Sequence, residues 1–485
     1  MAARAEEIVV IGAGMGGLSA AIRLAHAGLR VHVVDRAPGP GGKMRTMATE
    51  AGPVDAGPTV MTLRPIFEEL FDSTGARLSD YVTLHREEVL ARHWWPDGGT
   101  LDLFADEAAS ADAVGAFAGA QAEHEFRAFC ARARRLYQAF EGPMMLAGTP
   151  SQGALTRHVL THPGLILDMA PHRTLAQTLG ARFTDPRLAQ LFGRYATYVG
   201  GSPFRSPAIL GLIWHAEAQG VWRVEGGMKR LAQGLERLAR AQGAAFTFGT
   251  GVARIETRAG RVAAVHLEDG TRLPAEIVVF NGDPAALGAG LLGEGLRDTL
   301  PRAATHPRSL SAYVWSYAAV PKGPELVHHN VFFCTDPHTE FDPIAKGHMP
   351  EDGTLYICAQ DRGTGTSPQG LERFEIIMNG PPQADGADPT DEEKETCRTR
   401  TFETLARFGL TFDPTPGTDW LTTPRQFAKL FPASEGSLYG RSPHGLTASL
   451  KKPTARTKVA GLYLAGGGCL LYTSPGPRDR TRSRM

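Results

Sequence analysis

Apolar and polar positions in the first 35 residues follow two periods, and together they predict a strand, a helix and a second strand. Residues 7–11 (Glu-Ile-Val-Val-Ile) form a short apolar run that is typical of a buried parallel strand. Apolar side chains then recur at helical spacing through residues 18–25, and residues 31–35 (Val-His-Val-Val-Asp) form another strand-like run. The segment therefore predicts a βαβ unit with a tight connection at residues 12–17.

The connection in this unit has the pattern Gly-x-Gly-x-x-Gly, formed by Gly12, Gly14 and Gly17, with Gly16 beside the last of them. Such glycines permit a tight turn, let the backbone approach a pyrophosphate, and let the helix pack closely on the strand. Asp35 ends the second strand, 21 residues after Gly14, where an acidic side chain commonly holds a ribose hydroxyl. Because strand, helix and acid agree, a dinucleotide site is favoured over a purely structural turn.

Loops of small residues and periodic segments divide the rest of the chain. Pro38–Lys43 and Asp55–Thr59 are too rich in Pro and Gly to continue a helix or strand. With 485 residues the chain is too long for one ordinary core, so we expect two or three lobes. The remaining periodic segments are hairpin-like at 93–101, helical around 120–140, 205–217 and 226–242, and strand-like within 252–280 and 309–425.

Charge and cysteine content narrow the possible partners. Lys plus Arg and Asp plus Glu both number 51, so the net charge is zero and no nucleic-acid partner is expected. The five cysteines are scattered without a C-x-x-C pair, which is typical of reduced thiols in a cytosolic protein. A strand that begins by residue 7 leaves no room for a signal peptide, and no apolar run is long enough to span a bilayer.

Candidate metal and nucleophile motifs are weak. His158 and His162 could share a helix face, but they lack the Glu of H-E-x-x-H and Pro163 follows at once, so surface histidines are expected. His328 and His329 would point to opposite faces of a strand, so joint ligation is not expected. No Gly-x-Ser-x-Gly elbow is present. We therefore expect no metal site and no hydrolase triad.

Two further segments bear on the choice of dinucleotide, because Gly-x-Gly-x-x-Gly serves both NAD and FAD. Gly41-Gly42-Lys43 forms a second glycine turn just after the acidic strand. Residues 461–468 (Gly-Leu-Tyr-Leu-Ala-Gly-Gly-Gly) run from a buried strand into glycines near the other end of the chain. A cofactor stretched across the crevice of the sheet would draw on both segments.

Taken together, these segments resemble the carotenoid (phytoene-type) desaturases, part of the wider flavoprotein group that includes amine oxidases and protoporphyrinogen oxidase. The most specific stretches are 328–333 (His-His-Asn-Val-Phe-Phe) and 437–441 (Ser-Leu-Tyr-Gly-Arg). Residues 224–228 (Val-Glu-Gly-Gly-Met) and 379–382 (Asn-Gly-Pro-Pro) also match, and the resemblance runs from about 6 to 468. Within the group the chain is similar to the bacterial 1-hydroxycarotenoid 3,4-desaturases, also called methoxyneurosporene dehydrogenases.

The resemblance implies an α/β fold, in which a Rossmann-like FAD-binding domain carries an inserted mixed α+β substrate domain and a helical lid. The segments assigned on this basis are FAD-binding parts at 1–75, 216–300 and 426–468, a substrate and helical-lid region at 76–215, a substrate-domain sheet at 301–425, and an atypical, disordered tail at 469–485.

The same resemblance implies FAD as the cofactor. Val252 would begin the strand under the adenine end, where main-chain groups contact the base, and a plain strand valine is the alternative. The residues expected to bind FAD are Gly12, Gly14, Gly16, Gly17, Asp35, Gly41, Gly42, Lys43, Gly57, Pro58, Thr59, Val252, Gly466 and Gly467.

The implied reaction is a desaturation, in which a hydride passes to the flavin and a proton leaves the neighbouring carbon. A lipid-soluble carotenoid offers almost nothing to hydrogen-bond, so an apolar channel is expected. Glu225 is the candidate for handling the proton, with an exposed helix-start carboxylate as the alternative. The candidate channel residues, for each of which ordinary core packing is the alternative, are Leu210, Ile213, Trp214 and Phe332.

We further expect peripheral contact with a bacterial inner or intracytoplasmic membrane from the cytoplasm, and oxygen or a quinone as electron acceptor. The alternatives are a phytoene desaturase, another enzyme of the amine oxidase group, or a chain that binds polyene or membrane without flavin. The last arises because the family's His-Pro-Gly-x-Gly-x-Pro segment and final helix are replaced after Gly468 by an Arg-rich tail. That ending predicts a weakened flavin site.

Overall fold

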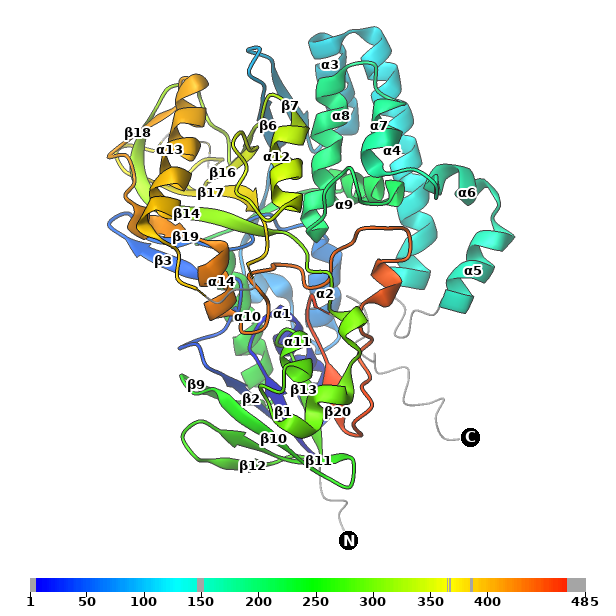
Figure 1. The fold of residues 1–485 in the computed structure, drawn as a ribbon, viewed down its shortest axis with the longest axis vertical. Coiled ribbons are helices and arrows are strands. Elements are labelled where there is room, and N and C mark those ends of the chain that lie inside the picture. Colours follow the sequence, from blue (N-terminus) through cyan, green and yellow to red (C-terminus); the bar gives the residue numbers. More distant parts are fainter. Residues whose placement is uncertain (1–5, 146–151, 364, 366–367, 384–386, 469–485) are drawn as a thin grey trace.

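Two sheets organise the chain, one in each of two lobes that lie one above the other (Figure 1). The computed structural model describes residues 6–145, 152–363, 365, 368–383 and 387–468. The atypical tail predicted at 469–485 lies outside these residues. No helix among the described residues is long and apolar enough to cross a membrane.

The lower lobe is built on a five-stranded sheet in the order β20-β13-β1-β2-β9, in which every neighbouring pair is parallel. Its near-continuous apolar strands are buried on both faces, as expected for a parallel sheet. The helices α1 (Met15–His26) and α10 (Met228–Ala241) cover one face. The strands are β1 (Glu7–Ile11), β2 (Arg30–Asp35), β9 (Ala245–Phe248), β13 (Ile277–Phe280) and β20 (Leu462–Leu464).

A small antiparallel sheet covers the other face of the parallel sheet (Figure 1). Val9 and Val34 of the parallel sheet share one apolar cluster with Val252, Ile255 and Val265 of this small sheet. The three strands are β10 (Val252–Arg258), β11 (Arg261–Leu267) and β12 (Arg272–Pro274).

The upper lobe contains an eight-stranded mixed sheet in the order β18-β14-β17-β16-β15-β6-β7, with β19 paired to β14. Its outer face packs against α13 (Asp391–Arg407) through Tyr317, Ile357 and Phe374. Its inner face turns toward the lower lobe and the helical insert. The strands are β6 (Val89–Trp94), β7 (Thr100–Phe104), β14 (Ser311–Lys322), β15 (His329–Phe332), β16 (Leu355–Ala359), β17 (Glu372–Gly380), β18 (Thr411–Asp413) and β19 (Leu421–Thr422).

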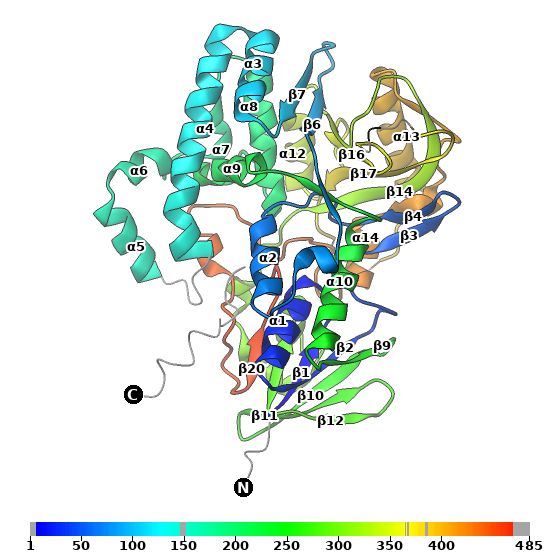
Figure 2. The same cartoon turned by 180° about the vertical axis from the view of Figure 1, so that it is seen from behind.

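A helical insert stands beside the mixed sheet, at the opposite end of the molecule from β10–β12 (Figure 2). Its core is an aromatic cluster in which Phe126, Phe192 and Trp214 contact one another edge to face or stacked. The elements are α3 (Glu107–Ala118), α4 (Ala120–Phe140), η2 (Glu141–Met145), α5 (Gln152–Thr161), α6 (Gly164–Met169), α7 (Leu175–Gly180), α8 (Pro186–Gly193), η3 (Arg194–Val199), η4 (Ala208–Leu212) and α9 (Ile213–Ala218).

Short elements connect the lobes. The hairpin of β3 and β4 leads from the parallel sheet to the inner face of the mixed sheet, and β8 returns from the insert to α10. The connecting elements are β3 (Thr46–Thr49), β4 (Gly52–Asp55), α2 (Arg64–Asp72), η1 (Leu78–Asp80), β5 (Leu84–Arg86), β8 (Trp222–Val224), α11 (Ala285–Gly288), η5 (Glu294–Thr299), η6 (Arg302–Ala304), α12 (Pro337–Ala345), η7 (Thr418–Trp420), α14 (Pro424–Leu430) and η8 (Ser449–Lys451).

The predicted fold class is confirmed, because a Rossmann-like parallel sheet carries a mixed sheet and a helical insert. The strands of the parallel sheet come from 7–35, 245–280 and 462–464. Within the range predicted to be helical around 205–217, a 3₁₀ turn (Ala208–Leu212) precedes a short α-helix (Ile213–Ala218). Pro207 restricts the start of this segment and Gly211 lowers its helix propensity.

Trp214 provides a test of the packing in the insert. Its side chain is 1% exposed and its indole N–H donates to Cys130 Sγ at 3.1 Å. We expect Trp214→Ala to lower the free energy of unfolding by about 3–5 kcal/mol, because it leaves a cavity in the aromatic cluster. Urea denaturation followed by circular dichroism would measure this. The control Leu167→Ala, at an exposed position, should change the value by about 0.5 kcal/mol or less, and equal effects would contradict the packing described.

Candidate functional site

The carboxyl edge of the parallel sheet forms a cradle of glycines. Gly14 is the N-cap of α1, and no side chain caps this helix, so its first amides are open to a ligand. A Cβ atom on Gly17 would lie 2.0 Å from the Gly12 carbonyl oxygen, and one on Gly16 would lie 2.6 Å from the Gly466 nitrogen. The turn therefore requires glycine at these positions and exposes a bare backbone surface.

Asp35 fixes this turn from the neighbouring strand. Its carboxylate accepts hydrogen bonds from the amides of Ala13 at 2.6 Å and Ala37 at 2.8 Å. The acid thus lies at the end of β2 and beside the glycine turn, where the sequence predicts a partner for a ribose. Val252 is the first residue of β10, the strand that follows β9 in the chain. The last residue of β9, Phe248, is paired with Asp35.

The second glycine turn packs directly on the first. Gly41 donates to the Ala13 carbonyl at 2.9 Å and forms a parallel bridge with Gly14. Gly41 and Gly42 both have positive φ, which favours glycine. Lys43 extends from this turn and donates to the Leu438 carbonyl, and burial lowers the pKa of its amine to about 8.

Asn281 completes the cradle and is a residue that the sequence analysis missed. It follows β13, and its amide side chain donates to the Gly12 carbonyl at 3.1 Å. A Cβ atom on Gly466 would meet its Oδ1 at 2.5 Å. An Asn-Gly pair directly after a buried strand was the signal that could have found it. Gly467 is exposed next to Gly466, so both of these predicted residues line the same edge.

The cradle fits an extended dinucleotide such as FAD. It offers an uncapped helix N-terminus, two stacked glycine turns and an acid at the end of β2, all at one sheet edge. Among the predicted cofactor residues, the structure brings together those of segments 12–17, 35, 41–43 and 466–467. These residues would hold the pyrophosphate and ribose parts of the cofactor.

The loop Gly57–Thr59 extends from the cradle to the inner face of the mixed sheet. Gly57 packs on the second glycine turn, because a Cβ atom there would lie 1.9 Å from the Lys43 carbonyl oxygen. Pro58 is exposed, and Thr59 Oγ1 lies 2.7 Å from the Tyr356 hydroxyl of β16. These three predicted residues therefore join the two lobes at the point where an extended cofactor would end.

Asp55 connects the same loop to α10. Its carboxylate accepts a hydrogen bond from the Met228 amide at 2.8 Å, so it caps this helix from another segment of the chain. Burial raises the pKa of Asp55 to about 6. Gln360 of the mixed-sheet lobe lies 3.1 Å from the Asp55 amide through Oε1, which adds a second link between the lobes.

The inner face carries two aligned rows of side chains across its central strands. Glu375, Cys358 and His329 are paired in one row, and Ile377, Tyr356 and Val331 in the next. Paired residues of an antiparallel sheet point to the same side. Val331 and Tyr356 share an apolar cluster with Val60 and the helical insert, so this face is covered.

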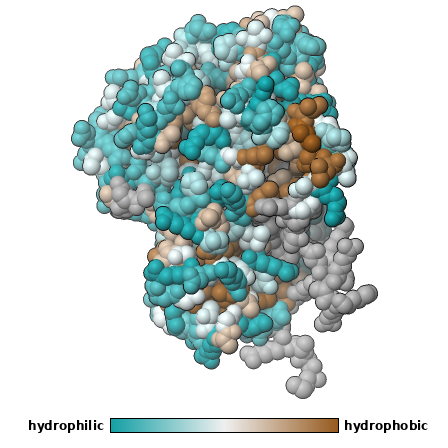
Figure 3. All heavy atoms as spheres, turned by 45° about the vertical axis from the view of Figure 1, so that its right-hand side comes forward, coloured by the Kyte–Doolittle hydropathy of each residue, from teal (hydrophilic) through white to brown (hydrophobic). Residues whose placement is uncertain are grey.

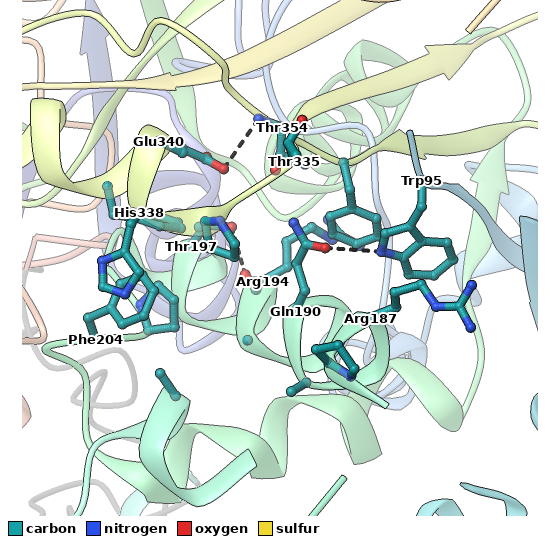
Figure 4. Close-up of a pocket in the computed structure, with 18 of the residues that line it drawn as sticks. Trp95, Arg187, Gln190, Arg194, Thr197, Phe204, Thr335, His338, Glu340 and Thr354 are labelled. Atoms are coloured by element: carbon teal, nitrogen blue, oxygen red, sulfur yellow. Dashed lines mark hydrogen bonds between the residues drawn. The ribbon is translucent and has the colours of Figure 1, made fainter. Parts of the chain in front are cut away.

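Two cavities flank these rows. A cavity of about 420 Å³ lies between α8, η3, α12 and the sheet, and is walled mainly by apolar side chains such as Trp95, Phe204 and Phe333 (Figure 4). Inside it, Gln190 Oε1 accepts from Trp95 Nε1 at 3.0 Å. Glu340 accepts from the Thr354 amide at 3.2 Å, and burial raises the pKa of Glu340.

The second cavity, of about 650 Å³, opens beside the start of α10, and Asp55, Thr59, Glu225 and Cys358 are among the residues that line it. Cys358 borders this cavity and Thr354 borders the first. Thr354 directly precedes β16 and Cys358 lies on it four positions later, or about 13 Å along an extended strand. The central rows of the inner face therefore lie between the two cavities.

The channel residues predicted from the sequence fall in two groups. Leu210 and Ile213 keep part of their surface accessible within the cluster that contains Val60 and Tyr356, so a channel role stays a prediction. Trp214 is instead packed in the core of the insert. Phe332 is fully buried on the outer face of the sheet, stacked on Trp94, because strand alternation turns its neighbours Val331 and Phe333 inward. Both positions are corrected to core residues.

Glu225 lies at the surface of the second cavity. Its side chain is 64% exposed and pairs with His85 Nε2 at 3.0 Å. This environment matches the helix-start carboxylate that was the alternative to a role in proton transfer. Nothing in the structure withdraws the carboxylate from water.

The prediction that His328 and His329 point apart is wrong. Their ring centroids are 4.5 Å apart, and the donor atoms of both histidines and Cys358 lie within 4.8 Å of one another. His328 precedes β15 and is outside regular strand geometry, so alternation does not govern it. His328 Nε2 lies 3.6 Å from Cys358 Sγ, and burial raises the pKa of this thiol well above its usual value. The contact is therefore that of a protonated thiol with a neutral imidazole.

Comparisons with protein families, with individual relatives and with solved structures all agree with the resemblance found in the sequence. Residues 15–470 match the family described as flavin-containing amine oxidoreductases. The hydroxyneurosporene desaturase of Cereibacter sphaeroides is 56% identical over 95% of this chain and 93% of that protein. The hydroxyneurosporene desaturase of Rhodobacter capsulatus is 49% identical over 97% and 94%, respectively. Among solved structures, cyclohexylamine oxidase from Brevibacterium oxydans matches with a TM-score of 0.53 at 15% identity, covering 97% of this chain and 95% of that one.

The solved structure supports the fold alone, whereas the two desaturases are related to this chain over nearly their whole length. The family resemblance found in the sequence, and FAD as the cofactor that it implies, are thereby confirmed. The chain belongs to the flavin-containing amine oxidoreductase family and, within it, to the carotenoid desaturases.

Proposed function

We propose that this chain desaturates an acyclic carotenoid that carries a 1-hydroxy or 1-methoxy group, converting the C3–C4 single bond beside the polyene into a double bond. The observation that carries this proposal is 56% identity, over nearly the full chain, to a protein named hydroxyneurosporene desaturase. The covered inner face between two cavities is consistent with a long, largely apolar substrate.

In this proposal FAD accepts the hydride, which is the difficult part of the chemistry. The residues of the chain bind, orient and exclude water. The glycine cradle holds the phosphates, and the loop Gly57–Thr59 carries the site to the inner face. The helical insert covers that face, so that Val60, Val331 and Tyr356 lie in a mainly apolar cluster from which water is excluded.

The first test concerns the cofactor. We expect the purified chain to show the absorption of bound oxidised flavin, and Gly17→Ala to lose it, because the new methyl group would clash with the Gly12 carbonyl. Gly39→Ala is the matched control, since a Cβ atom there meets nothing within 4 Å. A wild-type chain that binds no added FAD would favour the alternative of a polyene- or membrane-binding chain without flavin.

The second test concerns the reaction. We expect the flavin-loaded chain to convert a 1-hydroxylated acyclic carotenoid into a product that lacks two hydrogens and absorbs at longer wavelength, because conjugation is extended. Chromatography with mass detection would follow this, in parallel with phytoene and a primary amine as competing substrates. Assays with air as the only oxidant, and with an added quinone as the only oxidant, would identify the electron acceptor. Faster turnover of phytoene or of the amine would contradict the proposal.

We also propose that the chain works at the cytoplasmic surface of a bacterial inner or intracytoplasmic membrane. Leu160, Ile166 and Leu167 of α5 and α6 are exposed, and Figure 3 shows hydrophobic side chains gathered on this side of the molecule. Arg157 and Arg173 are exposed in the same segment. Apolar tips flanked by basic side chains favour insertion into a bilayer that contains anionic lipid.

This membrane contact can be tested by co-sedimentation with vesicles. We expect Leu160→Ser, Ile166→Ser and Leu167→Ser together to reduce binding to vesicles of phosphatidylethanolamine and phosphatidylglycerol by at least about 10-fold. Each substitution removes apolar area that would be buried in the bilayer on binding. The matched control replaces Leu291, Leu371 and Leu430, which are exposed on other segments, by serine. Equal loss in both triple variants would argue against a specific surface.

A further inference from the structure

The inner face of the mixed sheet is more polar than a hydrocarbon substrate requires. Glu375 and His329 lie in the row beside the loop Gly57–Thr59, and His329 Nε2 is a buried polar atom without a hydrogen-bond partner among the described residues. Burial of an unpaired polar group is costly, so such a group in a native structure calls for an explanation such as a catalytic role or a bound water, ion or ligand. The polar row therefore needs an explanation beyond packing.

His329 is the most sharply placed of these groups. Its side chain is 2% exposed, and Nδ1 lies 2.7 Å from the Tyr356 hydroxyl. The same hydroxyl lies 2.7 Å from Thr59 Oγ1, so the ring orientation is fixed through Tyr356 to the loop that carries the cofactor site. Nε2, on the other side of the ring, has no partner among the described residues.

Substrate chemistry determines where a hydroxyl of the proposed carotenoid must lie. The oxygen on C1 is joined to C3 by three single bonds of about 1.5 Å, so it lies within about 4 Å of the reacting carbon. Any residue that binds this hydroxyl must therefore lie at the reacting position and not at the far end of the channel. The cavity around Gln190 and Glu340 is not lined by any residue of the loop Gly57–Thr59, where an extended cofactor would end, so it does not meet this condition.

We propose that His329 Nε2 binds the hydroxyl of the substrate end group beside the reacting bond, with Tyr356 and Thr59 as positioning residues. This makes His329 the residue that distinguishes a hydroxylated carotenoid from its hydrocarbon parent. The inference rests on the proposed substrate class. It also explains why polar side chains occur on a face that is otherwise apolar.

The electrostatic state of His329 suits this role. Burial lowers the pKa of its imidazole well below the usual value, so the ring is neutral at physiological pH. A neutral ring offers either an N–H or a lone pair at Nε2, depending on its tautomer. A hydroxyl both donates and accepts, so it complements either form. A hydrocarbon end group would leave Nε2 unpaired, which disfavours that substrate.

The test compares His329→Phe with the wild type on two substrates of equal chain length, a 1-hydroxylated carotenoid and its hydrocarbon parent. Dissociation constants are measured by fluorescence quenching in detergent micelles, and kcat/KM by product analysis. We expect the variant to lose roughly 10- to 100-fold in both affinity and kcat/KM for the hydroxylated substrate, because the buried substrate hydroxyl is left without a hydrogen-bond partner. Values for the hydrocarbon should stay unchanged or improve.

Three further variants keep the test decisive. His93→Phe is the matched control, since His93 is a buried histidine on the inner face, next to Val331, and is bonded to the Leu101 carbonyl. It should affect both substrates alike. Tyr356→Phe should lose part of the preference through misorientation of the ring, and His329→Gln, if His329→Phe fails to fold, should retain part of it. Bound flavin reports folding in each case.

The outcomes separate the inference from the proposed function. Absence of any binding preference for the hydroxylated carotenoid in the wild type would overturn the inference. So would an equal loss of turnover on both substrates in His329→Phe with unchanged dissociation constants, which would give the imidazole a part in the chemistry instead. A flavin-loaded wild type that binds the hydroxylated carotenoid preferentially but turns over neither substrate would overturn only the proposed desaturation.

Discussion

Close approach of backbone to backbone at the carboxyl edge of the parallel sheet is the constraint on which the rest of the structure depends. Gly17 lies against Gly12, Gly16 against Gly466, and Gly57 against the Lys43 carbonyl, with no room for a side chain at any of these contacts. The contact within the turn fixes its shape, and the other two bring together segments that are separated in the sequence. The edge therefore becomes one continuous backbone surface, and the positions of the loop, the inner face and the insert follow from it.

Hydrogen bonds between the lobes fix the crevice. Asp55 holds the start of α10, and Thr59 holds Tyr356. These are short hydrogen bonds between elements of different lobes, and buried bonds of this kind are worth more when the whole network is satisfied. The polar residues of the crevice therefore serve two purposes: most join the lobes, whereas His329 retains an unpaired nitrogen.

The sequence was most informative where function depends on local backbone geometry. The βαβ unit, both glycine turns and Asp35 were predicted because each needs only a few consecutive residues of particular type. The face of the sheet toward which a side chain points was harder to predict. Phe332 was assigned to the channel although it faces outward, because an all-apolar run such as Val331–Phe333 does not reveal which face is covered. The histidine–thiol contact depends on pairing between distant strands, which no single segment encodes. Asn281 left only a short local signal, an Asn-Gly pair after a buried strand, and its contact with Gly12 joins distant segments.

The position of β20 in the parallel sheet has a consequence for the order of events during synthesis. The glycine turn at residues 12–17 leaves the ribosome long before its neighbour Gly466 is made. Contacts this distant in sequence form slowly, and domains usually acquire structure as they emerge. The nascent chain therefore holds an incomplete cradle until Gly466 has been made. Stable flavin incorporation follows that point, which favours cofactor loading after β20 has joined the sheet over loading of shorter nascent chains.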